Sequence, residues 1–176
     1  KRADFVEFLF LTGLRIGEAS GLQWSHVDIL KRVIYIQFSW NCNLKKLGPT
    51  KNPQSVRYVT LNDRCLEILE NFRKDKYGSK FVFVKSNGVQ IRNADINTYL
   101  KIEGARANLF GKNYKQFSAH MLRHSNITML AFLGAPQKAV MERVGHMDAR
   151  ITNGVYTHVL PENRQDLQLK LENLNL

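Results

Sequence analysis

Strand-forming sequence is concentrated in one short part of this chain, and this limits the fold more than any other feature. Residues 32–38 (RVIYIQF) and 56–61 (VRYVTL) are rich in β-branched and aromatic side chains, with the partial alternation of polarity that is typical of strands. The polar stretch between them contains Gly48, Pro49 and Pro53, so we expect a hairpin or a small antiparallel sheet. The chain is therefore predicted to be mainly α with a small antiparallel β-sheet (α+β) near its N-terminal half.

Most of the remaining chain has the spacing of apolar residues that indicates helices. Residues 3–11 are so apolar that we expect a buried helix, and Thr12–Gly13 interrupts it. Further helices are predicted as follows: a short one with Leu14, Ala19 and Leu22 inward, 62–74, 94–108, 118–133 with Ser118 as N-cap, 136–145, one that holds 154–160, and 161–176. With 176 residues, 44% of them hydrophobic, the chain from 1 to 176 is expected to be a single domain.

The positive charge of the chain is unevenly distributed. There are 26 Lys and Arg against 15 Asp and Glu, a formal net charge of +11. Residues 31–85 hold 12 basic and 4 acidic residues and residues 86–123 hold 6 and 2, whereas both ends are close to neutral. Without a long basic block, this pattern favours a folded basic face over a disordered tail. Such a face suits a polyanion, above all nucleic acid, although an ordinary soluble protein with a basic pI is the other interpretation.

Several classes of protein are disfavoured by what the sequence lacks. No apolar run approaches the ~20 residues that a membrane-spanning helix needs. Cys42 and Cys65 form no CxxC pair, which argues against a zinc site or a disulfide framework and favours a reducing cytoplasm. The acidic residues are scattered and no GxxxxGK[ST] loop occurs, so neither a two-metal site nor a nucleotide site is expected. We therefore predict no cofactor, no metal and no membrane partner.

Two short motifs place an arginine beside another polar residue on a helix. In TGLRIGE, residues 12–18, Arg15 lies three residues before Glu18, so both lie on one helix face. In HMLRH, residues 120–124, His120 and Arg123 have the same spacing. Taken alone, the first motif is most simply a surface ion pair and the second an exposed helix terminus.

Three more residues are candidates of the same kind. His146 follows a glycine in VGH, where a histidine can simply favour the C-terminal end of a helix. Tyr156 in GVYTH lies ten residues further on, and a lone tyrosine usually belongs to a core or an interface. Lys51 belongs to the stretch between the predicted strands, where lysines are ordinarily solvated. No one of these residues indicates a function by itself.

The order of the motifs along the chain is far more specific than any one of them. TGLRIGEA, a lysine between two strands, HMLRH and VGHMDARITNGVYTH resemble, in this order, the tyrosine recombinases of the phage integrase family. The resemblance runs from Phe5 to about Leu160 and implies the catalytic-domain fold of that family. The catalytic residues that it implies are Arg15, Lys51, His120, Arg123, His146 and, as the nucleophile, Tyr156. Glu18 is implied to orient an arginine or a histidine. Lys51 matches the family through TKNPQSVRY, and the alternatives are Lys45 and Lys46.

The resemblance implies an enzyme that cleaves and rejoins DNA strands through a 3′-phosphotyrosyl intermediate, without ATP or a metal. Two guanidinium groups can hold the non-bridging oxygens of a phosphodiester bidentately, which a lysine cannot do. In the implied reaction Tyr156 attacks the phosphorus, and His120 eases its proton off or binds the phosphate. Lys51 protonates the departing 5′-oxygen, and His146 donates a hydrogen bond to the phosphate.

The implied biological role is site-specific recombination, most simply the integration or excision of a phage or mobile element. The implied partners are double-stranded DNA, three further copies of the full-length protein in a tetramer, and accessory DNA-bending or directionality proteins. The expected location is the cytoplasm of a bacterial or phage-infected cell. Two alternatives stay open: a type IB topoisomerase that uses the same chemistry, and a DNA-binding protein without catalysis.

The two ends of the chain carry separate expectations. Relatives have a core-binding domain, and often an arm-binding domain, before the catalytic domain, and both are expected to be absent from residues 1–176. In the predicted helix over 161–176, the leucines at positions 167, 171 and 174 form a narrow apolar stripe. That helix is expected either to fold back on its own domain or, as the resemblance suggests, to dock on a neighbouring protomer.

Overall fold

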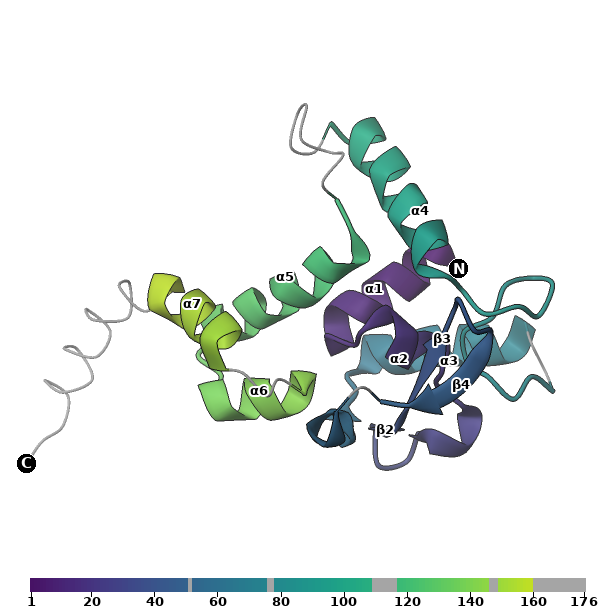
Figure 1. The fold of residues 1–176 in the computed structure, drawn as a ribbon, viewed down its shortest axis with the longest axis horizontal. Coiled ribbons are helices and arrows are strands. Elements are labelled where there is room, and N and C mark those ends of the chain that lie inside the picture. Colours follow the sequence, from purple (N-terminus) through teal and green to yellow (C-terminus); the bar gives the residue numbers. More distant parts are fainter. Residues whose placement is uncertain (51, 76–77, 109–116, 146–148, 160–176) are drawn as a thin grey trace, which may run out of the picture.

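Helices make up most of the structure and surround one main apolar core (Figure 1). The computed structural model describes residues 1–50, 52–75, 78–108, 117–145 and 149–159. Its helices are α1 Arg2–Thr12, α2 Ile16–Ser20, α3 Asp63–Asp75, α4 Asn93–Arg106, α5 Ala119–Phe132, α6 Gln137–Val144 and α7 Ala149–Val159, with 3-10 turns at Trp24–His26 and Pro53–Ser55. Its strands are β1 Val27–Asp28, β2 Val33–Ile36, β3 Phe38–Asn41, β4 Lys46–Pro49 and β5 Arg57–Thr60. The predicted α+β class is confirmed.

Helix α1 lies at the centre of the fold and packs against α3, α4 and α5 (Figure 1). Phe5 and Phe8 are fully buried, and their ring centroids lie 5.0 and 4.8 Å from that of Phe83. Phe72 of α3 joins the same group, with its ring 4.9 Å from that of Phe83. Tilted and edge-on contacts of this kind add to the gain from removing each ring from water. The buried helix predicted over residues 3–11 is confirmed.

The turn between α1 and α2 brings the first motif against α5 and α6. Gly13 has φ 67° and ends α1 in the left-handed conformation, with its N–H donating to the carbonyl of Leu9. A β-carbon at Gly13 would lie 2.6 Å from Oδ1 of Asn126 and 3.1 Å from a methyl group of Val144. Glycine is therefore needed here for the conformation and for the close approach. The inward positions predicted after this turn are buried: Leu14, Ala19 and Leu22.

The two predicted strands pair as expected in a three-stranded antiparallel sheet of order β1-β2-β5. Ile34 pairs with Val59, and both side chains face the core with at most 1% of their surface exposed. Tyr35 pairs with Tyr58 on the outer face of the sheet, where their ring centroids lie 4.8 Å apart. The alternation of inward and outward side chains fixes this register, because a slip by one residue would turn the apolar set towards solvent.

The predicted strand over residues 32–38 is wrong in one respect, because it is two strands. Strand β2 ends at Ile36, and β3 then pairs with β4 in a separate two-stranded sheet. This hairpin occupies the stretch that we predicted to be a polar connection. The chain leaves the first sheet at Gln37, whose side-chain amide bonds the ring of His26 and whose carbonyl accepts the N–H of Thr50.

Helix α2 lets the β3–β4 hairpin pack directly on its backbone. A β-carbon at Gly17 would lie 2.5 Å from Oγ of Ser39, and one at Gly21 would lie 2.9 Å from the main-chain nitrogen of Trp40. The two glycines are one helical turn apart and so leave a bare strip on α2. The hairpin needs this strip, which is the physical reason why β3 departs from the line of β2.

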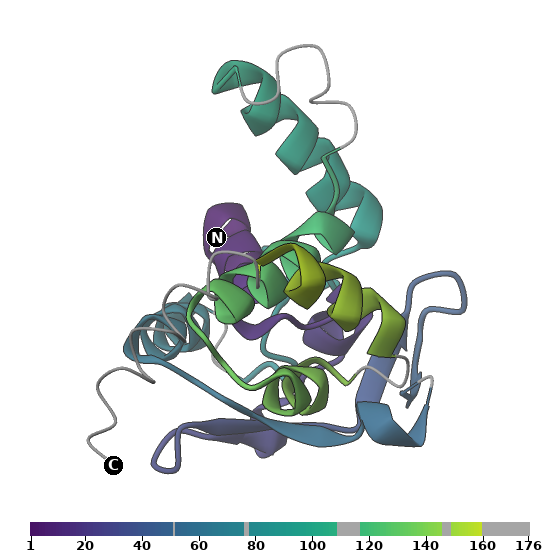
Figure 2. The ribbon, with the colours of Figure 1, turned by 90° about the vertical axis from the view of Figure 1, so that its left-hand side faces the viewer.

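Helices α5, α6 and α7 form a second packed group, in which α5 packs on α1 and α6 also contacts strand β5 (Figures 1 and 2). Ile127 of α5 is fully buried against Val140 and Val144 of α6. Val155 and Tyr156 of α7 pack on the same cluster. Tyr156 is therefore positioned by packing on a cluster that α5 and α6 build together.

Helices α5 and α7 lie where they are predicted, and only one capping contact differs. Helix α7 runs from Ala149 to Val159 and so contains the described part of the helix predicted to hold 154–160. Ser118 does occupy the N-cap position of α5, but its side chain makes no capping bond. Asn97 of α4 takes that role, since its Oδ1 accepts the N–H of Ala119 at 2.9 Å.

Two further predictions concern the C-terminal end and the membrane. The helix predicted over 161–176 lies outside the described residues. Within the residues that the structure does describe, no helix combines the length and the apolar character needed to cross a membrane.

Candidate active site

Arg15 and Glu18 form an ion pair at the start of α2, as their spacing predicts. Nη1 of Arg15 lies 2.9 Å from Oε1 of Glu18, and the main-chain N–H of Arg15 donates to Oε2 at 3.0 Å. The carboxylate is buried, with 2% of its surface exposed, whereas 37% of the Arg15 side chain is exposed. This is not a simple surface ion pair, because the Glu18 carboxylate is buried while the Arg15 side chain that it binds is partly exposed to solvent.

A second arginine, Arg57 on β5, binds the other side of Glu18. Its Nη2 lies 2.9 Å from Oε2, and only 6% of the Arg57 side chain is exposed. Burial raises the pKa of the Glu18 carboxyl, but the charges and hydrogen bonds of Arg57 and Arg15 outweigh it and hold that pKa below its usual range. Glu18 is therefore ionised near neutral pH. Arg57 is not among the site residues predicted from the sequence, although the alternation in VRYVTL places it on the same face as the buried Val59.

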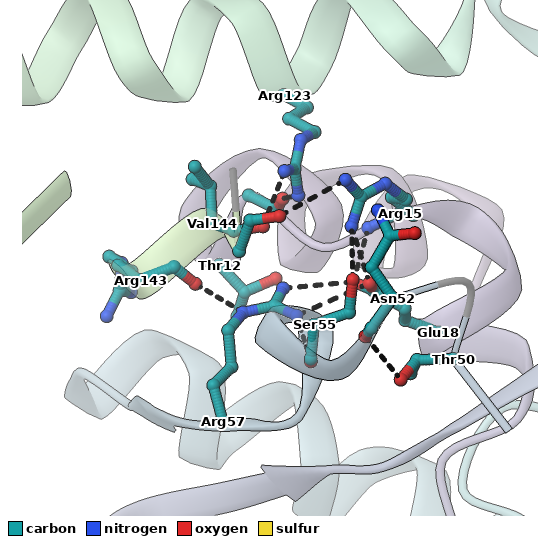
Figure 3. A network of polar contacts seen from close by, with 12 residues as sticks. Thr12, Arg15, Glu18, Thr50, Asn52, Ser55, Arg57, Arg123, Arg143 and Val144 are labelled. Carbon is teal, nitrogen blue, oxygen red and sulfur yellow. Dashed lines mark hydrogen bonds and ion pairs between the residues drawn. The ribbon is translucent and has the colours of Figure 1, made fainter. Parts of the chain in front are cut away.

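Arg123 reaches the same place from α5 and is almost fully buried, with 2% of its surface exposed. Its Nη1 donates to the carbonyl of Gly13 at 2.7 Å and its Nη2 to that of Val144 at 2.5 Å. Arg15 donates to the next carbonyl, that of Gly145, at 3.3 Å (Figure 3). Arg123 and Arg15, the two predicted catalytic arginines, thus donate to the carbonyls of consecutive residues at the end of α6. This places their guanidinium groups side by side.

The charge of Arg123 is poorly compensated by its surroundings. Burial, followed by the positive charge of Arg15, lowers the pKa of Arg123 to about 9. Its two hydrogen bonds to Gly13 and Val144 go to neutral carbonyls, which help less than an anion would. A bound anion would relieve this penalty. Within the part of the chain that the structure describes, hydrogen bonds occupy two of the five N–H donors of the guanidinium.

His120 lies one turn before Arg123 on α5, towards solvent. Its ring centroid is 4.6 Å from that of His124, nearly at a right angle. Partial burial and the positive charges of His124, Arg123 and Arg15 keep the pKa of His120 below its ordinary value. The ring is therefore largely neutral near pH 7 and can accept a proton.

Tyr156 is half-buried on α7, and its hydroxyl donates to the carbonyl of Ala135 at 2.6 Å. Ala135 belongs to the connection between α5 and α6, and burial raises the pKa of the phenol above its usual range. The described position therefore keeps the phenol protonated. Val144 connects Tyr156 with the arginines. Its side chain belongs to the cluster on which Tyr156 packs, and its carbonyl accepts a hydrogen bond from Arg123.

Lys51 and His146 lie outside the described residues, but described neighbours of both positions are part of the site. Thr50 donates its hydroxyl to the carbonyl of Asn52 across position 51, at 3.3 Å. Ser55, in the same connection, has its Oγ 3.4 Å from Nη1 of Arg15. Gly145, bonded to Arg15, directly precedes position 146. The alternatives to Lys51 lie in the β3–β4 hairpin: Lys45 in its turn and Lys46 on β4.

The charged groups that the structure describes at this site are three arginines, at positions 15, 57 and 123, and the carboxylate of Glu18. Among the residues that the structure describes, no group of three or more His, Cys, Asp and Glu side chains could hold a metal ion. Glu18 is the buried carboxylate of the site, and both of its oxygens are already bound by Arg15 and Arg57. The arrangement is suited to binding a phosphate group between Arg15 and Arg123.

Comparison with known proteins gives relatives of one kind. The integrase of Staphylococcus phage L54a is 32% identical over 187 residues, which cover 98% of this chain and 52% of that protein. The ICEBs1 integrase of Bacillus subtilis strain 168 is 28% identical over 184 residues, which cover 97% of this chain and 48% of that protein. The chain therefore spans about half the length of the curated relatives it matches.

The fold is also similar to that of an integrase. The Tn1549 transposon integrase, solved in complex with circular intermediate DNA, superposes with a TM-score of 0.79 at 25% sequence identity, covering 96% of this chain and 59% of that one. Residues 1–163 match the sequence model of the phage integrase family. The resemblance found in the motifs thus extends over almost the whole chain, which belongs to the phage integrase family of tyrosine recombinases.

Proposed function

We propose that this chain is the catalytic domain of a site-specific DNA recombinase that integrates or excises a phage or mobile element. One observation carries the proposal most directly. Arg15 and Arg123, from helices far apart in the sequence, bind the adjacent carbonyls of Gly145 and Val144 and so present two guanidinium groups together. Two such groups match the two non-bridging oxygens of a phosphodiester. The named relatives, which are integrases of a phage and of a mobile element, support the same role.

The charge balance of the site favours an anionic transition state. As the phosphorus is attacked, negative charge gathers on its non-bridging oxygens, and fixed cations stabilise that charge without reorganising. The lowered pKa of Arg123 means that its cationic form is costly without an anion. Binding the phosphate repays that cost, and repays it most where the negative charge is greatest.

The proposed nucleophile is Tyr156, which must leave its bond to the Ala135 carbonyl before it attacks. A free phenol has a pKa of about 10, so full ionisation at pH 7 costs about 4 kcal/mol. Because burial raises the pKa of Tyr156 further, loss of the proton and attack must be coupled. His120, which is largely neutral, is the proposed acceptor of that proton or a further ligand of the phosphate.

The proposed step conserves the number of phosphoester bonds. The bond from phosphorus to the 5′-oxygen breaks as the bond to the phenol oxygen forms, and Lys51 supplies a proton to the departing oxygen. His146 donates a hydrogen bond to the phosphate, and Glu18 orients Arg15. Religation reverses the step, with a 5′-hydroxyl as the attacking group, so neither ATP nor a metal is consumed.

The proposed partner is double-stranded DNA in the cytoplasm of a bacterial or phage-infected cell. Exchange between two duplexes breaks four strands, and one nucleophile per strand requires four copies of the full-length protein. Accessory DNA-bending or directionality proteins are proposed to act with the tetramer. The leucine stripe at positions 167, 171 and 174 needs an apolar surface to cover, and we propose that segment 161–176 docks on a neighbouring protomer within it.

The proposal is tested with the full-length protein and a duplex nicked next to the scissile phosphate, so that the product strand diffuses away and religation is blocked. A recombinase accumulates a covalent protein–DNA adduct that survives denaturing electrophoresis. A DNA-binding protein without catalysis shifts the duplex but leaves no adduct. A type IB topoisomerase forms the adduct and relaxes supercoiled plasmid without a specific site, whereas a recombinase joins two copies of its own site.

Removal of metal should leave cleavage unchanged. The guanidinium groups of Arg15 and Arg123 supply the positive charge that metal ions supply in two-metal nucleases, so adduct formation in EDTA should equal that in Mg²⁺. The measurement is the single-turnover rate of adduct formation at matched ionic strength, because DNA binding itself depends on salt. Loss of cleavage on chelation, restored by added Mg²⁺, would contradict the proposed mechanism.

Cleavage should fall at acidic pH as His120 becomes protonated and can no longer accept a proton. Because the positive charge of His124 helps to lower the pKa of His120, His124→Gln should raise that pKa. The acidic limb of the rate profile should therefore move to higher pH in His124→Gln. The measurement is the adduct rate as a function of pH at saturating protein. Ser125→Ala, at the exposed neighbouring position, is the control and should leave the limb in place. An unmoved limb in His124→Gln would rule out His120 as the titrating group.

A further inference from the structure

We propose that Arg57 is a positioning residue of this active site, which aligns the phosphate-binding Arg15 through Glu18. The inference rests on the proposed function and deepens it, since it adds a residue that does not touch DNA to the machinery of the same reaction. Arg57 lies on β5 in the sheet, with its side chain directed under α2 and the end of α6 (Figure 3).

The guanidinium of Arg57 binds three separate segments at once. Its Nε donates to the carbonyl of Arg143 at 2.6 Å, and its Nη1 donates to the carbonyl of Ser55 at 2.8 Å. The remaining contacts go to Glu18, at 2.9 Å from Nη2 to Oε2 and 3.3 Å from Nη1 to Oε1. A planar fork with fixed donors suits such a junction, and a lysine could not reproduce it.

Each carboxylate oxygen of Glu18 is shared between the two arginines. Oε1 receives Nη1 of Arg15 at 2.9 Å, and Oε2 receives the main-chain N–H of Arg15 at 3.0 Å, while Arg57 approaches both oxygens from the other side. The orientation of the carboxylate, and hence of the Arg15 guanidinium, is therefore fixed from behind by Arg57. Without Arg57, Glu18 would lose two of its four donors and could rotate.

The same side chain also contacts Ser55 and Gly145, which are described residues near positions 51 and 146. Ser55 follows position 51 in the connection to β5, and Gly145 precedes position 146. A β-carbon at Gly145 would lie 3.1 Å from Nη1 of Arg57, so the peptide at the end of α6 rests directly on the guanidinium. Gly145 has φ 68°, and its carbonyl accepts Nη2 of Arg15. Arg57 thus ties Glu18, and through it Arg15, to Ser55 and to the end of α6.

Stability alone is a weak reason for such a group. A buried ion pair often contributes little net stability, because desolvation of the two charges offsets their attraction. The Arg15 side chain is 37% exposed, and this exposed part would remain available to a phosphate whether or not Arg57 is present. What Arg57 adds is orientation, and a misplacement of about 1 Å at a catalytic group can slow a reaction about 100-fold.

The test compares two scissile groups in the full-length protein: an ordinary phosphodiester, and a methylphosphonate in which a methyl group replaces one non-bridging oxygen and removes the charge. Arg57→Met keeps a long apolar stem but removes every donor. On the phosphodiester, we expect adduct formation at saturating protein to slow by about 100-fold. On the neutral methylphosphonate, aligned guanidinium groups matter less, so the defects of Arg57→Met and Arg15→Ala should both shrink. A purely structural defect would be equal on the two substrates.

Arg64→Met is the matched control, because Arg64 is also bidentate to a glutamate. Its Nε and Nη2 lie 2.9 and 2.8 Å from the carboxylate oxygens of Glu7 and join α3 to α1. This variant should cleave both substrates at the wild-type rate. If Arg57→Met does not fold, Arg57→Lys carries the comparison: it retains the charge but not the fork, and should show a smaller defect with the same dependence on the substrate.

The outcomes distinguish a failure of the proposed recombinase function from a failure of the positioning role of Arg57. If the wild-type protein forms no adduct, the proposed function fails and the role of Arg57 fails with it. If the wild type forms the adduct and the Arg57 variants match it, only the positioning role is overturned. Equal defects on the phosphodiester and the methylphosphonate would also overturn that role, since Arg57 would then act on folding alone.

Discussion

Replacing Tyr156 with phenylalanine should abolish the covalent adduct and leave DNA affinity unchanged. The substitution removes only the phenol oxygen, which is the proposed attacking atom, and keeps the ring that packs against the cluster of Ile127, Val140 and Val144. The hydroxyl also donates to the carbonyl of Ala135, so the variant should lose about 1 kcal/mol of unfolding free energy at most. The measurements are adduct yield on the nicked duplex, binding by gel shift, and thermal unfolding, all on the full-length protein.

Tyr58→Phe provides the matched control for this substitution. Tyr58 lies on the outer face of the sheet with 68% of its surface exposed, and it loses the same oxygen without touching the site. This variant should form adduct like the wild type. Persistent adduct in Tyr156→Phe, at the wild-type linkage position in the DNA, would mean that another residue is the nucleophile and would overturn the assignment.

Much of the fold could be predicted because local patterns specify it. The apolar run at 3–11, the glycine at position 13 and the alternating strands each depend on residues close together in the sequence, and each was found where predicted. The split of the first strand could not be predicted in this way. It depends on the bare strip that Gly17 and Gly21 leave on α2, and glycines in a short helix give no sign of what packs on them.

The site shows the same division between local and long-range information. The spacing of Arg15 and Glu18 predicts their ion pair, and the structure places it there. The sequence indicates a site role for Arg57 more weakly. Arg57 lies on the same inner face of its strand as Val59, and a buried arginine needs a buried partner. That partner, Glu18, is 39 residues away in the sequence, and no local rule connects them. The bond between Tyr156 and Ala135 likewise depends on how α7 docks on the α5–α6 connection.

Replacing Arg123 should reduce cleavage more than any substitution except that of the nucleophile. An arginine aimed at a transferring phosphoryl group is worth roughly 10³–10⁵ in rate, and Arg123→Met should lose an effect of that order. Arg123→Lys should recover little of it. A single ammonium group cannot hold the carbonyls of Gly13 and Val144 and at the same time present two donors to a phosphate. The measurement is the single-turnover rate of adduct formation at saturating protein.

The effect on stability should be much smaller than the effect on rate, and this separates a catalytic role from a structural one. Arg123→Met leaves the two carbonyls without their donor, at about 1–3 kcal/mol for each buried group that stays unsatisfied. It also removes a buried positive charge that lies beside another positive charge, that of Arg15, and this gain offsets part of the loss. Unfolding of the variant should therefore remain cooperative, with a lower midpoint.

The control for Arg123 is Arg64→Lys, the same exchange in the ion pair that joins α1 and α3, which should leave cleavage unchanged. The scissile methylphosphonate gives a second criterion. Since Arg123 is proposed to stabilise charge on the non-bridging oxygens, its variants should lose less on the neutral substrate than on the phosphodiester. Suppose that Arg123→Met remains folded and bound to DNA, and that its rate relative to wild type falls equally on the phosphodiester and on the methylphosphonate. Arg123 then does not act on the phosphate. In that case the pairing of two guanidinium groups over Val144 and Gly145 would serve only to hold the end of α6 in place.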